Sequence, residues 1–144
     1  MLAVDTNILV YAHRREASEH AAAAEVLRSL AEGTQAWGLP WPCVYEFFSV
    51  TTNVRIWGQS ASTPRQAWTQ LVAWLASPSL RLLGETDQFP SLLARFATLP
   101  RVRGGVIHDA RIAALCVAHG VEALLTRDRD FSLFSELRTR DPLT

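Results

Sequence analysis

The chain has 144 residues, 49% of them apolar, and a formal net charge of zero. This length suits one domain with a hydrophobic core, so we expect residues 1–144 to form a single domain. A neutral chain has no strong overall field for nucleic acids or membranes, so RNA binding would need a local arginine patch. All 14 basic residues are arginine, which excludes any mechanism that needs a catalytic lysine.

The two cysteines predict a reducing environment. Cys43 and Cys116 lie in apolar helical patterns, and neither has a second cysteine at metal-binding or redox spacing. Such residues are usually buried thiols. No apolar run approaches the ~18 residues of a membrane span, and the first residues lack the basic region of a signal peptide. We therefore expect a cytoplasmic protein.

The first third of the chain reads as strand, helix, helix. A short apolar run over 1–4 is interrupted by Asp5, and a helix is expected over 8–12. Ser18 is expected to cap a second helix that Gly33 ends. The pattern is typical of a buried strand followed by helices that cover it.

A second strand is expected over 35–39, before a helix over 42–53 that has a proline in its first turn. Thr63 and Gln66 then form the pattern of a capping box, with Pro64 at the first helical position. The expected buried face of the helix that follows consists of Trp68, Leu71, Val72 and Leu75.

The last part of the chain continues the alternation of strands and helices. The expected elements are a strand over 80–83, a helix capped by Thr86, a loop over 100–105, a helix over 106–119 ended by Gly120, a strand over 121–126, a helical turn over 131–134 and an edge strand over 137–139. Such alternation predicts a parallel sheet with helices on both faces. Ligands of these sheets gather beyond the carboxyl ends of the strands.

Four acidic residues lie at positions that could share that end of the sheet. Asp5 closes the first strand, and Asp128 follows the fourth strand by two residues. Asp109 lies in the first turn of the helix that leads into the fourth strand. Each of these could also be a cap or turn residue. Glu46 interrupts an aromatic run, where a half-buried acid needs a reason.

Four carboxylates in one cleft repel each other unless a cation neutralises them. Oxygen ligands without histidine or cysteine favour Mg²⁺ or Mn²⁺. Two such ions ~3.5–4 Å apart can activate water and stabilise the leaving oxygen of a phosphodiester. The predicted metal ligands and catalytic residues are Asp5, Glu46, Asp109 and Asp128. The predicted supporting polar residues are Thr6, Asn7 and Thr126.

The segments around these acids resemble the four acidic motifs of the PIN-domain family, and specifically those of VapC-type toxins from toxin–antitoxin pairs. The matching segments are Val4-Asp5-Thr6-Asn7-Ile8-Leu9, Pro42-Cys43-Val44-Tyr45-Glu46-Phe47, His108-Asp109-Ala110-Arg111-Ile112-Ala113 and Thr126-Arg127-Asp128-Arg129-Asp130-Phe131. The resemblance covers nearly the whole chain, with the motifs in the order of the family.

The resemblance implies a three-layer α/β fold in which helices flank a five-stranded parallel sheet of order 3-2-1-4-5. It implies a Mg²⁺-dependent endoribonuclease, the toxin of a VapBC-type pair, with a cognate antitoxin that blocks the acidic cleft. It also implies a homodimer. Asp5, Glu46, Asp109 and Asp128 carry over as metal-site residues, although Asp130 also offers an acid in the fourth motif.

Residues in or near loops could bind the RNA. The arginines expected to contact phosphate are Arg14, Arg15, Arg55, Arg101 and Arg103. Trp41 and Trp57 could stack on unpaired bases or pack against an antitoxin helix, although packing in a core or dimer interface is the more common role of tryptophan.

Other functions fit parts of the pattern. A two-component receiver and a haloacid-dehalogenase-type phosphatase also place acids at strand ends, but both need a lysine that this chain lacks. A catalytically silent module with the same fold could act by occupying RNA or a partner. A structure-specific DNA nuclease also remains open, because no sequence feature separates RNA from DNA here.

Overall fold

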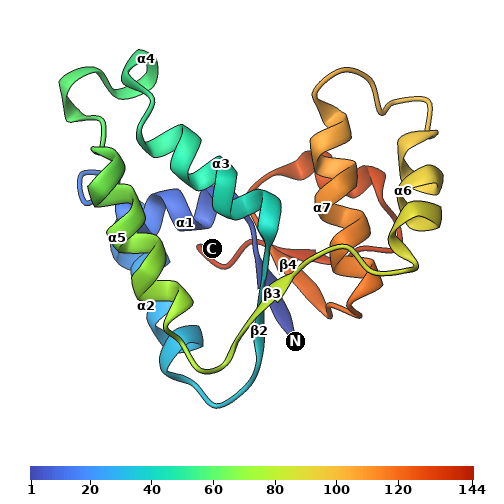
Figure 1. The fold of residues 1–144 in the computed structure, drawn as a ribbon, viewed down its shortest axis with the longest axis horizontal. Coiled ribbons are helices and arrows are strands. Elements are labelled where there is room, and N and C mark those ends of the chain that lie inside the picture. The colour runs from blue at the N-terminus through green and yellow to red at the C-terminus, as the bar shows by residue number, and fades with distance from the viewer.

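The computed structural model describes residues 1–144. Five parallel strands form one sheet, with α1, α2 and α5 on one side of it and α6 and α7 on the other (Figure 1). The strands are β1 (Leu2–Val4), β2 (Trp37–Pro40), β3 (Leu80–Leu83), β4 (Ala123–Leu125) and β5 (Thr139–Arg140). Their order is β3-β2-β1-β4-β5, which confirms the order implied by the family resemblance.

Seven α-helices and two short 3-10 helices connect the strands. The α-helices are α1 (Thr6–His13), α2 (His20–Glu32), α3 (Trp41–Thr51), α4 (Val54–Trp57), α5 (Pro64–Leu75), α6 (Phe89–Ala97) and α7 (Val106–Ala118). The 3-10 helices are η1 (Gly58–Ser60) and η2 (Arg129–Leu133). The expected elements are all present, with ends shifted by one to a few residues.

The central strand β1 determines where the functional site lies. It pairs with β2 on one side and with β4 on the other, with Val4 opposite Leu125. The N–H of Asp5 donates to the carbonyl oxygen of Leu125 at 3.0 Å, so the pairing continues one residue past the strand. Asp5 and Thr126 therefore emerge side by side at the carboxyl edge of the sheet.

A single core cluster of buried side chains surrounds the sheet on both faces. Its largest fully buried members include Trp37, Phe47 and Leu124. The three inner strands β1, β2 and β4 are apolar and almost wholly buried, as expected for strands covered on both faces. The edge strands β3 and β5 each contain exposed residues. No helix combines the length and the apolar character that a bilayer crossing requires.

Two of the expected helix caps are wrong. The helix after Ser18 begins at His20, and the Ser18 hydroxyl donates to the carboxylate of Glu19 at 2.6 Å instead of capping it. The helix after Thr86 begins three residues later, because the carbonyl of Thr86 first accepts a turn hydrogen bond from the N–H of Phe89. In both cases a tight turn separates the polar residue from the helix.

The buried face of α5 also differs from the expected one. The capping box of Thr63 and Gln66 is present, but α5 buries Ala67, Leu71 and Trp74, whereas Trp68 is 53% exposed. The sequence has apolar residues on two sides of this helix, so periodicity alone could not choose between them. The choice is made by contact with α3, because the Trp74 ring packs edge-on against Phe47, 5.1 Å between centroids.

The orientation of α5 can be tested with two neighbouring aliphatic residues. Leu71→Ala removes a side chain that is 1% exposed, and we expect it to lower the free energy of unfolding by about 2–4 kcal/mol. Val72→Ala, at a position 47% exposed, should change it by less than about 0.5 kcal/mol. Denaturant unfolding measures both, and a larger loss for Val72→Ala would show that the helix faces the other way.

Candidate active site

Asp5 stands at the junction of β1 and α1. Its backbone is still extended, while its Oδ1 accepts a hydrogen bond from the N–H of Thr6 at 2.8 Å and so caps α1. Aspartate is among the residues that best satisfy the free N–H groups at a helix start. The side chain is only 5% exposed, so the strand end and the helix start together fix the position of this carboxylate.

The hydroxyl of Thr126 joins the ends of β1 and β4. It donates to Oδ2 of Asp5 at 2.7 Å and accepts from Nδ2 of Asn7 at 3.1 Å. The backbone N–H of Asp128 donates to the same hydroxyl oxygen at 3.0 Å. Two segments more than a hundred residues apart in the sequence, 5–7 and 126–128, are thereby held around one oxygen atom. Thr126 and Asn7 lie where supporting polar residues were expected.

Glu46 reaches the same region from α3. Its Oε2 accepts a hydrogen bond from the hydroxyl of Thr6 at 2.7 Å. Thr6 therefore bonds to Glu46 through its side chain and to Asp5 through its backbone. Phe47 and Cys43 are fully buried, which anchors α3 and leaves the half-buried Glu46 directed toward the end of β1. Of the aromatic residues around Glu46, Phe47 belongs to the buried surface of the helix, whereas Tyr45 is 62% exposed.

Asp109, Asp128 and Asp130 form the other part of the acidic group. Each offers a carboxylate oxygen, and the three oxygens all lie within 4.8 Å of one another. Asp109 lies in the first turn of α7. Asp128 caps η2 by accepting from the N–H of Asp130 at 2.9 Å. Asp128 is half-buried and Asp130 is exposed.

The four predicted acids line one cleft of about 350 Å³. Asp5, Glu46, Asp109 and Asp128 all line it, whereas Asp130 does not. The remaining lining residues are Thr6, Asn7, Val10, Tyr11, Val50 and Trp57. The sequence analysis missed Val10, Tyr11 and Val50, although each lies three or four residues after a polar lining residue on the same helix, a spacing that places side chains on one face.

The crowding of these acids changes their protonation. The pKa of Asp5 is raised to about 6, chiefly by burial and to a smaller extent by the charges of Glu46 and Asp128, while the hydrogen bonds from Thr126 and Thr6 act to lower it. Burial, followed by the charge of Asp128, raises the pKa of Asp109 to about 6 as well. Both shifts arise because a negative charge is costly in a partly desolvated site among other carboxylates.

The cysteines are buried, as expected, and are unsuited to bind metal. Burial raises the pKa of the Cys116 thiol to about 12. Burial also raises the pKa of Cys43 well above its usual range, helped by the charge of Asp5. The Cys43 sulfur lies 3.7 Å from Oδ1 of Asp5 and donates to it. A protonated thiol is a hydrogen-bond donor and a poor ligand, since metals bind thiolates.

The donor set fits a hard divalent cation. Every side chain that could bind an ion in the cleft offers oxygen, and no histidine lines it. Burial and, to a smaller extent, the neighbouring carboxylates raise the pKa of Asp5 and of Asp109, and a bound cation would favour the charged form of both. Mg²⁺ and Mn²⁺ are the ions that such carboxylate sites favour.

The five arginines expected to bind phosphate fall into two groups. Arg15, Arg55, Arg101 and Arg103 are exposed. Arg14 differs from the expectation of a free loop residue, because it is 6% exposed and its guanidinium donates to the carbonyl oxygen of Ser60 at 2.7 Å. None of the five lines the acidic cleft.

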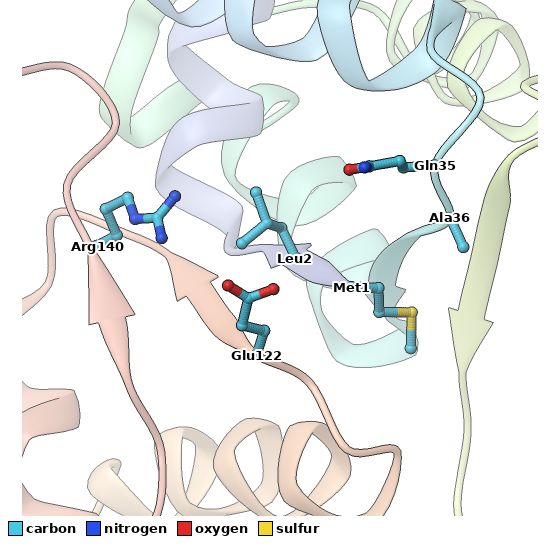
Figure 2. A pocket seen from close by; sticks show the side chains of 6 residues that line it. All are labelled: Met1, Leu2, Gln35, Ala36, Glu122 and Arg140. Atoms are coloured by element: carbon cyan, nitrogen blue, oxygen red, sulfur yellow. The ribbon is translucent and has the colours of Figure 1, made fainter.

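A second hollow lies at the opposite, amino end of the sheet. It has a volume of about 540 Å³ and is lined by Met1, Leu2, Gln35, Ala36, Glu122 and Arg140 (Figure 2). It contains a single acid and a single base, and none of the residues in the four acidic motifs. The larger hollow therefore lacks the carboxylate cluster that metal chemistry needs.

A parallel α/β sheet with carboxylates gathered at the ends of β1 and β4 is the arrangement of a metal-dependent nuclease domain. A comparison with protein families supports this class. The model of the PIN domain family matches residues 2–137. The chain therefore belongs to the PIN-domain family.

Proteins of similar sequence place the chain in one group within the PIN-domain family. The chain is 36% identical over 143 residues to Ribonuclease VapC43 of Mycobacterium tuberculosis, covering 99% of this chain and 96% of the relative. It is 29% identical over 140 residues to Ribonuclease VapC48 of the same species, covering 97% and 96%. Within the PIN-domain family the chain belongs to the VapC group, as its four motifs indicated.

Solved structures share the fold at low sequence identity. VapC20 of Mycobacterium tuberculosis, described as a Sarcin-Ricin loop cleaving toxin, superimposes with a TM-score of 0.66 at 17% identity, covering 92% of this chain and 93% of the other. The VapBC2 structure from Rickettsia felis, bound to a promoter DNA fragment, gives 0.67 at 17% identity and covers 96% of each chain. These similarities support the architecture described above.

The raised pKa of Asp5 makes the stability of the metal-free protein depend on pH. The carboxyl of folded Asp5 titrates near 6, against 3.8 for an ordinary one, so its charge destabilises the fold above about pH 6 and has no effect below about pH 4. We expect Asp5→Asn to remove this pH-dependent penalty, although it also loses hydrogen bonds that the carboxylate accepts at every pH. In EDTA, the change in the free energy of unfolding on substitution should therefore be more favourable at pH 7.5 than at pH 4, by on the order of 1–3 kcal/mol.

Thermal and denaturant unfolding at both pH values measure this effect. Asp87→Asn, which removes an exposed carboxylate outside the cleft, is the control and should change stability little at either pH. An effect of Asp5→Asn on stability that is the same at pH 7.5 and at pH 4 would contradict the raised pKa of Asp5.

Proposed function

We propose that residues 1–144 act as one metal-dependent endoribonuclease domain, the toxin component of a VapBC-type toxin–antitoxin pair. The observation that carries this proposal is the cleft in which Asp5, Glu46, Asp109 and Asp128 meet from four separate segments. The relatives named as VapC ribonucleases support RNA as the substrate class. The reaction is hydrolysis of a phosphodiester.

Asp5, Glu46, Asp109 and Asp128 would hold the divalent ion, Mg²⁺ or Mn²⁺. When bound, the ion supplies charge stabilisation at the phosphodiester and lowers the pKa of water. Binding also relieves the repulsion that raises the pKa of Asp5 and Asp109. Asp128 serves as the fourth acid in this proposal, because it lines the cleft and Asp130 does not.

The surrounding polar residues hold the carboxylates in place. The Thr126 hydroxyl keeps Oδ2 of Asp5 in one orientation, and the Thr6 hydroxyl does the same for Oε2 of Glu46. Asn7 donates to both Thr126 and Asp5. Such fixed orientation matters because a misaligned ligand weakens both ion binding and the alignment of the reacting groups.

The proposed toxin would work in the cytoplasm, where RNA is present, and would be controlled by a cognate antitoxin. Solved structures of similar fold include VapBC2 from Rickettsia felis and VapBC-1 from nontypeable Haemophilus influenzae. We extend the antitoxin partnership and the homodimer to this chain as part of the proposal. Size-exclusion chromatography with light scattering distinguishes a dimer of about 32 kDa, twice the 16.0 kDa of one chain.

The nuclease proposal predicts cleavage that depends on both metal and carboxylates. Single-stranded RNA should be cut in Mg²⁺ or Mn²⁺, and EDTA should abolish the cutting. Asp5→Asn and Glu46→Gln should each lower the cleavage rate by more than about a hundredfold, because each removes a charge that binds the ion. Glu122→Gln, in the hollow at the other end of the sheet, is the matched control and should leave the rate unchanged.

Gel analysis of end-labelled RNA and DNA oligonucleotides measures this cleavage. RNA that is bound but never cut, with either metal, would favour a silent binding module. Cutting of DNA in preference to RNA would favour a DNA nuclease.

The fourth motif can be resolved in the same assay. Asp128→Asn should lower the cleavage rate by more than about a hundredfold, whereas Asp130→Asn should lower it by about tenfold, the lower end of the range for a residue that supports a metal ligand. The reverse ranking would assign the fourth ligand to Asp130, whose oxygen also lies within 4.8 Å of those of Asp109 and Asp128.

A further inference from the structure

The cleft has an apolar wall that metal chemistry does not use. Besides the carboxylates and their polar partners, Val10, Tyr11, Val50 and Trp57 line the same space of about 350 Å³. The acids and their hydroxyl partners explain how an ion and a phosphate would be held. They do not explain why a large aromatic ring borders the place where the reaction would occur.

Trp57 is held rigidly in that wall. Its Nε1 donates to the carbonyl oxygen of Val50 at 2.7 Å, and the guanidinium carbon of Arg14 lies 4.0 Å from its ring centroid. Arg14 is fixed in turn by two hydrogen bonds to Ser60 and an ion pair with Glu16. An aromatic ring that is locked before binding loses little entropy when a ligand stacks on it.

The apolar wall lies one helical turn from the acids. On α1, Tyr11 follows Asn7 by four residues, and on α3, Val50 follows Glu46 by four residues. One turn advances ~5.4 Å along a helix axis. A polynucleotide presents a similar pairing of an anionic phosphate with a flat, largely apolar base one sugar away. Tryptophan is among the side chains that take up such unstacked bases in RNA recognition.

We propose that Trp57 is a stacking platform for an unpaired nucleobase next to the phosphodiester that is cut. This inference rests on the proposed nuclease function and adds to it the requirement that the substrate be single-stranded at this position. A base in a duplex is already stacked and paired, so its ring cannot reach the wall of the cleft.

The shape of the cleft favours a base over a protein helix. An α-helix with side chains is about 10–12 Å wide, and two turns of it need more volume than the cleft of about 350 Å³ provides. The wall also continues directly into the carboxylate site, which gives an attached phosphate its place. A nucleotide could place its phosphate at the carboxylate site and its base against the apolar wall at the same time.

Trp41 provides a matched control within the same chain. It stacks on Tyr45, 6.1 Å between ring centroids, and the two line a different pocket that contains none of the four acids. Trp41 is 37% exposed, so a substitution there also removes an accessible indole ring. It should have no effect on a base held beside the carboxylates.

The experiment compares two probes and four proteins, which are the wild type, Trp57→Leu, Trp57→Phe and Trp41→Leu. The probes are a uridine dodecamer and an abasic ribose-phosphate dodecamer of equal length and charge, bound in Ca²⁺ after gel analysis confirms that the RNA stays intact. Wild-type protein should bind the uridine dodecamer on the order of tenfold more tightly than the abasic one, the range expected for base stacking on one aromatic ring. This preference should largely disappear in Trp57→Leu and persist in Trp41→Leu.

Trp57→Phe keeps a stacking surface and should retain most of the preference for uridine, even if Leu at this position disturbs α4. Equal binding of both dodecamers by the wild type, or an undiminished preference in a folded Trp57→Leu, would overturn the stacking role and leave the wall to a protein partner. Wild-type protein that cuts RNA but shows no preference contradicts only the stacking. Protein that neither binds nor cuts any RNA contradicts the nuclease function as well.

Discussion

The rest of the site depends on the hydrogen bond from the Thr126 hydroxyl to the Asp5 carboxylate. This hydrogen bond in turn depends on the parallel pairing of β1 and β4. The bond is 2.7 Å long and buried. It places the carboxyl ends of two neighbouring strands in contact, and Asn7 and the N–H of Asp128 join the same hydroxyl. Without the pairing of Val4 with Leu125, Asp5 and Asp128 would have no reason to approach each other.

The gathered carboxylates oppose folding, and the fold tolerates them because of the groups around them. Burial raises the pKa of both Asp5 and Asp109 to about 6, which is a measure of how unfavourable their charges are in this cleft. The hydrogen bonds from Thr6 and Thr126 act in the other direction on Asp5. A divalent cation would offset the remaining repulsion, so the feature that weakens the metal-free protein is the one that makes it able to bind metal.

The helices α1 and α3 each line both the carboxylate part and the apolar part of the cleft. On α1, Asn7 lies in the first turn and Tyr11 in the next, and on α3, Glu46 lies in the second turn and Val50 in the next. Each helix therefore contributes a polar side chain to the cleft and, four residues later, a side chain of the apolar wall. Trp57, held between Val50 and Arg14, closes the apolar side and gives the cleft a rigid ring.

The sequence by itself determined the alternation of strands and helices, the family and the identity of the acids, because these depend on local patterns. Apolar runs, the capping box at Thr63 and four acidic motifs are all readable within short windows, and the structure brings the acids together. Local patterns could not decide which apolar face α5 buries, where the helices after Ser18 and Thr86 begin, or that Arg14 is buried under Trp57. Those features depend on contacts between segments distant in sequence, such as Trp74 with Phe47, and only the tertiary structure decides them, because many sequences with the same periodicity can pack either face inward.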